Sequence, residues 1–69
     1  MATIAVIEDE RELASLLRTH LESAGHTVLL AFDGPTGVAL VERERPDLIV
    51  LDLMLPGFDG LEVCRRVRR

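Results

Sequence analysis

Three short apolar runs, separated by stretches with helical spacing, constrain the fold of this 69-residue chain more than any other feature. The runs are Thr3–Ile7 (TIAVI), Thr27–Ala31 (TVLLA) and Leu48–Leu53 (LIVLDL). Short, continuously apolar segments rich in β-branched residues are typical of buried strands. Strands that alternate with helices favour a parallel sheet with helices packed on its faces. The sequence therefore predicts an α/β fold with the element order βαβαβα.

Local signals set the expected limits of the helices. The first begins near Arg11 and ends before Gly25, which stands where a helix C-cap requires a positive φ. The second begins at the turn Asp33-Gly34-Pro35, where Asp33 or Gly34 can serve as the cap, and it must end before Pro46. A third helix is predicted after Asp59, with a capping box and a stripe of apolar residues: Leu61, Cys64 and Val67.

Composition excludes several classes of protein. The single cysteine, Cys64, rules out an internal disulfide and fits a reducing compartment. No apolar run is long enough to span a bilayer, and no secretion signal is visible, so we expect a cytoplasmic protein without membrane contact. The net charge of −4 argues against nucleic-acid binding by this segment itself. His20 and His26 are expected to face solvent.

Carboxylates follow two of the three predicted strands. Thr3–Ile7 runs into Glu8 and Asp9, and the apolar run LIVL ends at Asp52. Parallel strands bring their carboxyl ends to one edge of a sheet, so the three carboxylates meet if these strands are neighbours. Hard oxygen ligands of this kind suit Mg²⁺. A carboxylate beside Mg²⁺ can also attack phosphorus and form an aspartyl phosphate.

The segments IAVIEDE (Ile4–Glu10) and LIVLDLMLPGFDG (Leu48–Gly60), with the spacing between them, resemble the receiver domains of bacterial two-component response regulators. The resemblance covers the whole chain. It implies a flavodoxin-like parallel sheet with strand order 2-1-3 in the part that the chain covers. It also implies that Asp52 accepts a phosphoryl group from a histidine kinase. Such domains catalyse only their own phosphorylation and dephosphorylation, so no other enzymatic activity is expected.

The resemblance also assigns the metal ligands and an output. Asp9 matches the direct Mg²⁺ ligand, and Glu8 matches the acid that acts partly through water. Asp52 completes the set of carboxylates, and Met54 matches the residue that supplies a backbone carbonyl. The segment DLMLPGFDGLEVCRRVR is similar to regulators with a winged-helix DNA-binding domain, which implies transcriptional control through a further domain.

The chain departs from the family in length. Residues 1–69 match only the first three βα units, so we expect a partial receiver domain. The family's serine or threonine after strand four and its lysine after strand five have no counterpart in this match, because neither strand is included. The chain also contains no lysine that could substitute. Strand three, which lies inside the intact sheet, becomes an apolar edge, and such edges pair with other chains. Self-association, for example as a two-fold dimer, is therefore expected.

Two other functions remain open at this point. The chain could be an assembly fragment that is not phosphorylated at all. It could also be a phosphatase of the haloacid dehalogenase type, which likewise uses an aspartate after an apolar strand. That chemistry requires a second acid two residues later as proton donor, and Met54 occupies the position. The phosphatase is therefore the weaker alternative.

Overall fold

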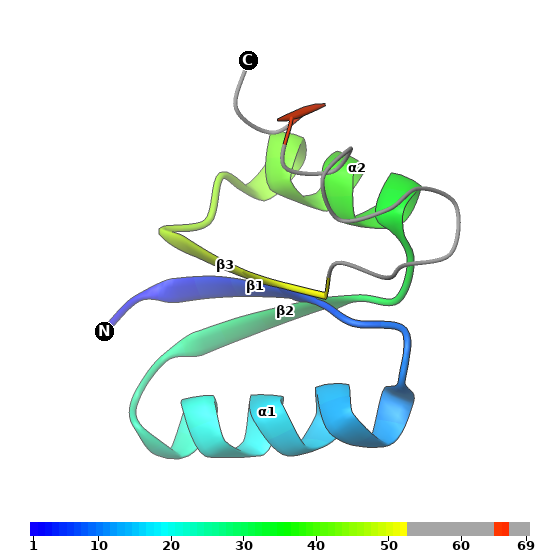
Figure 1. Cartoon of the computed structure of the whole chain (residues 1–69). Helices are drawn as coiled ribbons and strands as arrows, with labels where there is room; N and C mark the ends of the chain where they lie inside the picture. Colours follow the sequence, from blue (N-terminus) through cyan, green and yellow to red (C-terminus); the bar gives the residue numbers. More distant parts are fainter. Residues whose placement is uncertain (53–64, 67–69) are drawn as a thin grey trace.

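The computed structural model describes residues 1–52 and 65–66. Helix α1 lies on one side of a small sheet and helix α2 on the other (Figure 1). The strands and helices of this part of the chain follow the order that the sequence predicts. They are β1 (Thr3–Ile7), α1 (Arg11–Ser23), β2 (Thr27–Ala31), α2 (Gly34–Glu44) and β3 (Leu48–Leu51).

The sheet is parallel, and β1 is its central strand. The order is β2-β1-β3, which confirms the expected α/β fold and strand order. In the register, Ile7 pairs with both Ala31 and Leu51. All three strands therefore end level with one another, and the residues that follow them lie along one edge. Of the predicted third helix, the structure describes only Arg65 and Arg66, which are helical; its remaining residues lie outside the described part.

The limits of both helices follow from local chemistry. Gly25, just after α1, has φ +94°, which a side chain would disfavour. At the start of α2, the Asp33 carboxylate accepts a hydrogen bond from the Thr36 N–H at 2.8 Å. This N-cap bond lowers the pKa of Asp33 below its ordinary value. Arg45 ends α2 in the left-handed conformation, directly before Pro46.

The core is built around β1. Ala5 and Ile7 point toward α2 and form a buried cluster with Ala31, Val38 and Leu40. Successive side chains of a strand alternate between faces, so the other buried residues of β1 point toward α1. Because both faces of β1 are covered, the position of the residues that follow it is well determined. The buried residues on the α1 side are Ile4, Val6 and Ala14.

The third strand lies at an edge of the described sheet, as expected, but the burial that its apolar run predicts was wrong for the described residues. Leu48 is 55% exposed, and the other three residues of β3 are only partly buried. The reason is position: β3 is an outer strand of the sheet, while α1 packs against β1 and β2. The strand is also shorter than expected. It ends at Leu51, Asp52 follows outside it, and Leu53 lies outside the described residues.

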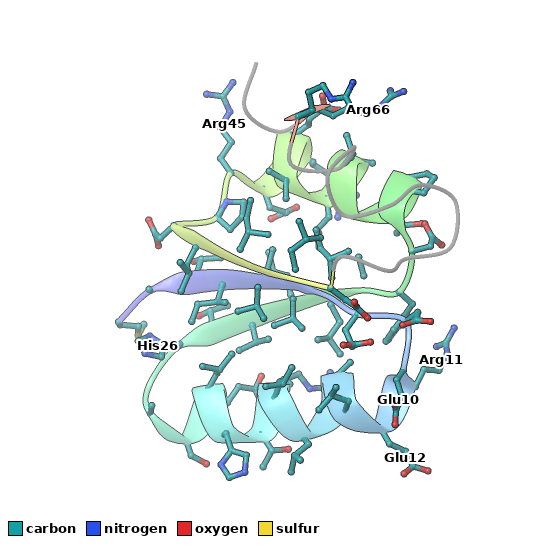
Figure 2. The ribbon with its side chains drawn as sticks, in the orientation of Figure 1. Glu10, Arg11, Glu12, His26, Arg45 and Arg66 are labelled. Carbon is teal, nitrogen blue, oxygen red and sulfur yellow. The ribbon has the colours of Figure 1, made fainter. Side chains whose placement is uncertain are left out.

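The beginning of β1 is held by side chains from both of its neighbours. The Ala2 N–H donates to His26 Nδ1 at 3.1 Å, and the Thr3 N–H donates to Asp47 Oδ2 at 2.8 Å. His26 is therefore partly buried rather than solvent-facing as predicted, whereas His20 is exposed. In Figure 2 the His26 ring lies at the opposite end of the sheet from Arg11.

Candidate functional site

Backbone hydrogen bonds fix the two chain segments that carry the acidic residues. The Glu8 N–H donates to the Ala31 carbonyl, and the Asp52 N–H donates to the Ile7 carbonyl, each at 3.0 Å. Each bond extends the strand pairing by one residue beyond the strand. Glu8 and Asp52 are thus attached to the end of a rigid sheet, which is the kind of support that a precise site requires.

The three predicted carboxylates lie together at this edge. Glu8, Asp9 and Asp52 each offer one oxygen atom, and these atoms all lie within 4.8 Å of one another. Asp9 is exposed, while Glu8 and Asp52 are partly buried. The structure therefore brings together all of the predicted acidic residues. Met54, the fourth predicted ligand, lies outside the described residues.

The electrostatics of the cluster show that the acids crowd one another. The Glu10 N–H donates to Glu8 Oε2 at 3.0 Å, and this bond by itself lowers the pKa of Glu8. Partial burial and the neighbouring Asp9 and Asp52 act in the opposite direction and prevail, so the pKa of Glu8 is raised. An opposite charge at this edge would relieve the repulsion.

The donor set fits a small, hard cation. Carboxylate oxygens are the ligands that Mg²⁺ prefers, and it usually takes one or two of them together with water and a phosphate oxygen. A site at the end of parallel strands is also open to solvent and to an approaching ligand. The same edge could thus hold a cation and admit a phosphorylated molecule.

One feature near this edge was not predicted. The guanidinium carbon of Arg11 lies 4.1 Å from the centroid of the Phe32 ring, which is a cation–π contact. Arg11 begins α1 and Phe32 follows β2. No sequence spacing signals such a contact, because the two residues meet only when β1 and β2 pair. In Figure 2 the side chains of Arg11 and Glu10 extend in different directions from the start of α1, and Glu12 points away from the sheet.

Comparison with known proteins decides the family. The response regulator receiver domain family matches residues 4–69, which is nearly the whole chain. The chain belongs to this family. The receiver fold accounts for the parallel sheet and for the acidic cluster at the ends of β1 and β3. Neither the phosphatase nor the assembly fragment is favoured as an alternative.

Relatives of this receiver domain include transcriptional regulators. The chain is 49% identical over its full length to the transcriptional regulatory protein AfsQ1 of Streptomyces coelicolor, of which it covers 31%. It is 36% identical to the BeF3-activated receiver domain of Klebsiella pneumoniae RstA, with a TM-score of 0.90, covering 96% of this chain and 56% of that one.

A third similar protein is the response regulator TrrA of Thermotoga maritima, solved in complex with Mg²⁺-BeF. It is 32% identical, with a TM-score of 0.93, and the match covers 99% of this chain and 59% of that one. The receiver chain thus spans 31% of its curated relative and 56% to 59% of these solved chains. In its described part, neither helix has the length and apolar character needed to cross a bilayer.

Proposed function

We propose that this chain is a phosphoacceptor of two-component signalling. Asp52 takes a phosphoryl group from a histidine kinase, with Mg²⁺ held by Glu8, Asp9, Asp52 and the backbone carbonyl of Met54. Phosphorylation then controls transcription through a DNA-binding output domain of the same protein. The observation that carries the proposal is the convergence of three carboxylate oxygens within 4.8 Å at the end of a receiver sheet.

The reaction is a direct transfer. A carboxylate oxygen of Asp52 attacks the phosphorus of a phosphohistidine and forms a new P–O bond. The P–N bond breaks, and its electron pair leaves with the imidazole, so the product is an acyl phosphate. Bound Mg²⁺ would neutralise part of the negative charge that gathers on the phosphoryl oxygens. The role of Glu8 and Asp9 is to hold the Mg²⁺ that supplies this positive charge.

The relatives support the cofactor and the output. TrrA was solved with Mg²⁺-BeF, which supports a Mg²⁺ site here. AfsQ1 is a transcriptional regulatory protein, which supports a DNA-binding output. We take residues 1–69 to be the first three βα units of a receiver domain, and the reducing setting that a lone cysteine fits supports a cytoplasmic location.

The test is Mg²⁺-dependent phosphorylation by acetyl phosphate, using the full-length protein that contains this chain and residues 1–69 alone. Intact-mass spectrometry should detect one added phosphoryl group in Mg²⁺ and none in EDTA, with peptide mapping placing it on Asp52. Asp9→Asn should weaken Mg²⁺ binding by about tenfold or more, whereas the nearby Glu12→Gln should not. A full-length protein that acquires no aspartyl phosphate would refute the proposal.

We also propose that residues 1–69 self-associate through the outer edge of β3. This strand is wholly apolar, and Leu48 at its beginning is 55% exposed. Apolar strand edges pair with other chains unless charges or bulges prevent it. Antiparallel pairing of β3 with the β3 of a second copy would produce a two-fold dimer.

Sedimentation equilibrium tests this association. Residues 1–69 should form a dimer whose fraction rises with concentration, and Leu48→Lys should shift the chain to the monomer because it places a charge on the edge. Leu16→Lys is the matched control, since Leu16 is similarly exposed at 54% but lies on α1. A chain that remains monomeric at high concentration would exclude the dimer.

A further inference from the structure

Arg11 occupies a position that helix energetics disfavour. It is the first residue of α1, where the partial positive charge of the helix N-terminus repels a cation and attracts acids. An acidic residue there would stabilise the helix better. Positions that break a local rule without helping the fold are often functional. The neighbouring acids offset part of the repulsion, but they do not account for a cation at this position.

The Phe32 ring determines where the positive charge lies. The guanidinium carbon is 4.1 Å from the ring centroid, and Phe32 itself is partly buried between β2 and α2. In the described part of the chain, the guanidinium thus rests on an aromatic face rather than on a carboxylate. A guanidinium has five N–H donors, and a ring contact leaves donors available for an anion.

The strand register places this cation across the sheet edge from the phosphoacceptor. Phe32 and Asp52 are the residues that follow Ala31 and Leu51, and both of these pair with Ile7. Neighbouring strands lie about 4.8 Å apart, so the ends of β2 and β3 are separated by about 10 Å. This separation is about one Debye length, within which a charge still acts on an approaching ion.

We propose that Arg11, held by Phe32, is a positioning residue that attracts and orients the anionic phosphoryl donor as it approaches Asp52. This inference rests on the function proposed above. The acidic edge attracts a cation but repels a phosphorylated donor, and the chain as a whole carries a net charge of −4. A fixed cation beside the acidic edge weakens this repulsion of anions and raises the rate at which the donor meets Asp52 productively.

The position of the charge gives the inference a distinctive signature. The positive charge of Arg11 beside the acidic edge favours the approach of the anionic donor and disfavours the binding of Mg²⁺. Removing it should therefore slow phosphorylation and strengthen Mg²⁺ binding. A purely structural role would give a different result, because damage to α1 or to the edge of the sheet would weaken donor use and metal binding together.

The experiment measures phosphorylation of Asp52 by acetyl phosphate and Mg²⁺ affinity in the full-length protein that contains this chain. Arg11→Gln should lower the second-order rate by about three- to tenfold at low salt, with the difference shrinking at high salt. Arg11→Lys should retain most of the rate, and Phe32→Leu should lose part of it. Arg18→Gln is the matched control, because it removes the same charge about 10 Å further along the same helix.

The possible outcomes distinguish the proposed phosphoacceptor function from the inference about Arg11. If the wild type acquires no phosphoryl group, the proposed function fails and this inference fails with it. If the wild type is phosphorylated but Arg11→Gln and Arg18→Gln react at the same rate, the inference alone is overturned. It is also overturned if Arg11→Gln weakens Mg²⁺ binding and phosphorylation in parallel. Slower phosphorylation with equal or tighter Mg²⁺ binding supports it.

Discussion

Asp52→Asn should reduce phosphorylation by acetyl phosphate to background while the protein stays folded. The amide oxygen has nearly the size of the carboxylate oxygen but carries no full negative charge, so it cannot act as the nucleophile. The backbone of residue 52 should keep its place, because its N–H donates to the Ile7 carbonyl at 3.0 Å and the side chain takes no part in that bond. Intact-mass spectrometry measures the loss directly.

The same substitution should also raise stability in the absence of Mg²⁺. Asp52 is one of the charges that raise the pKa of Glu8, so removing it relieves repulsion in the folded state. The midpoint of urea unfolding in EDTA should therefore increase. Loss of phosphorylation together with greater stability separates removal of the nucleophile from general damage to the fold.

Asp47→Asn is the matched control for Asp52→Asn, because Asp47 precedes β3 as Asp52 follows it. Its Oδ2 accepts a hydrogen bond from the Thr3 N–H, and an amide oxygen can still accept that bond. Phosphorylation of Asp47→Asn should equal that of the wild type. Persistent phosphorylation of Asp52→Asn in the full-length protein, mapped to another residue, would show that the acceptor has been assigned wrongly.

The sequence was sufficient wherever a local pattern determines the structure. Thr3–Ile7 and Thr27–Ala31 form strands with the predicted bounds, because continuous apolar runs have few alternatives inside a parallel sheet. The end of α1 followed from Gly25, and the convergence of the acids followed from strand direction alone. Each of these features can be predicted from a single segment of the chain, or from the rule that parallel strands end at the same edge of a sheet.

The sequence was insufficient where a residue depends on its tertiary neighbours. The LIVL run predicts a buried strand, but the exposure of its side chains depends on which other elements pack against β3. His26 became a hydrogen-bond acceptor for the Ala2 N–H only because β1 and β2 start level with each other. The contact of Arg11 with Phe32 has the same origin at the other end of these strands. Such contacts have no local signature, so a sequence pattern cannot reveal them.

Gly37→Ala should destabilise the fold by about 1–2 kcal/mol, even though alanine is the better helix former. A Cβ at position 37 would lie 2.7 Å from Ile7 Cδ1 and 2.8 Å from Ile7 Cγ2, both closer than packed carbon atoms allow. Ile7 is fully buried and β-branched, so it has little freedom to move aside. The clash should outweigh the helix gain of about 1 kcal/mol. Urea unfolding in EDTA measures the difference.

Two further variants separate the clash from the helix propensity. Ala39→Gly reports the intrinsic difference between glycine and alanine at an exposed position of the same helix. Ile7→Val removes the Cδ1 atom and should cost about 0.5–1.5 kcal/mol alone. The double variant Gly37→Ala with Ile7→Val should lose less unfolding free energy than the two single variants lose in sum, because the valine relieves the closest contact. Strict additivity would show that the helix and β1 are not tightly packed here.

The close approach of α2 to Ile7 also links packing to the acidic edge. Ile7 directly precedes Glu8, and its carbonyl accepts the hydrogen bond from the Asp52 N–H. A displaced Ile7 should therefore separate the carboxylates and weaken Mg²⁺ binding, although position 37 carries no charge. Gly37→Ala should lower Mg²⁺ affinity, and adding Ile7→Val should restore part of it. If affinity is unchanged while stability falls, the glycine serves the core alone and does not help to position the site.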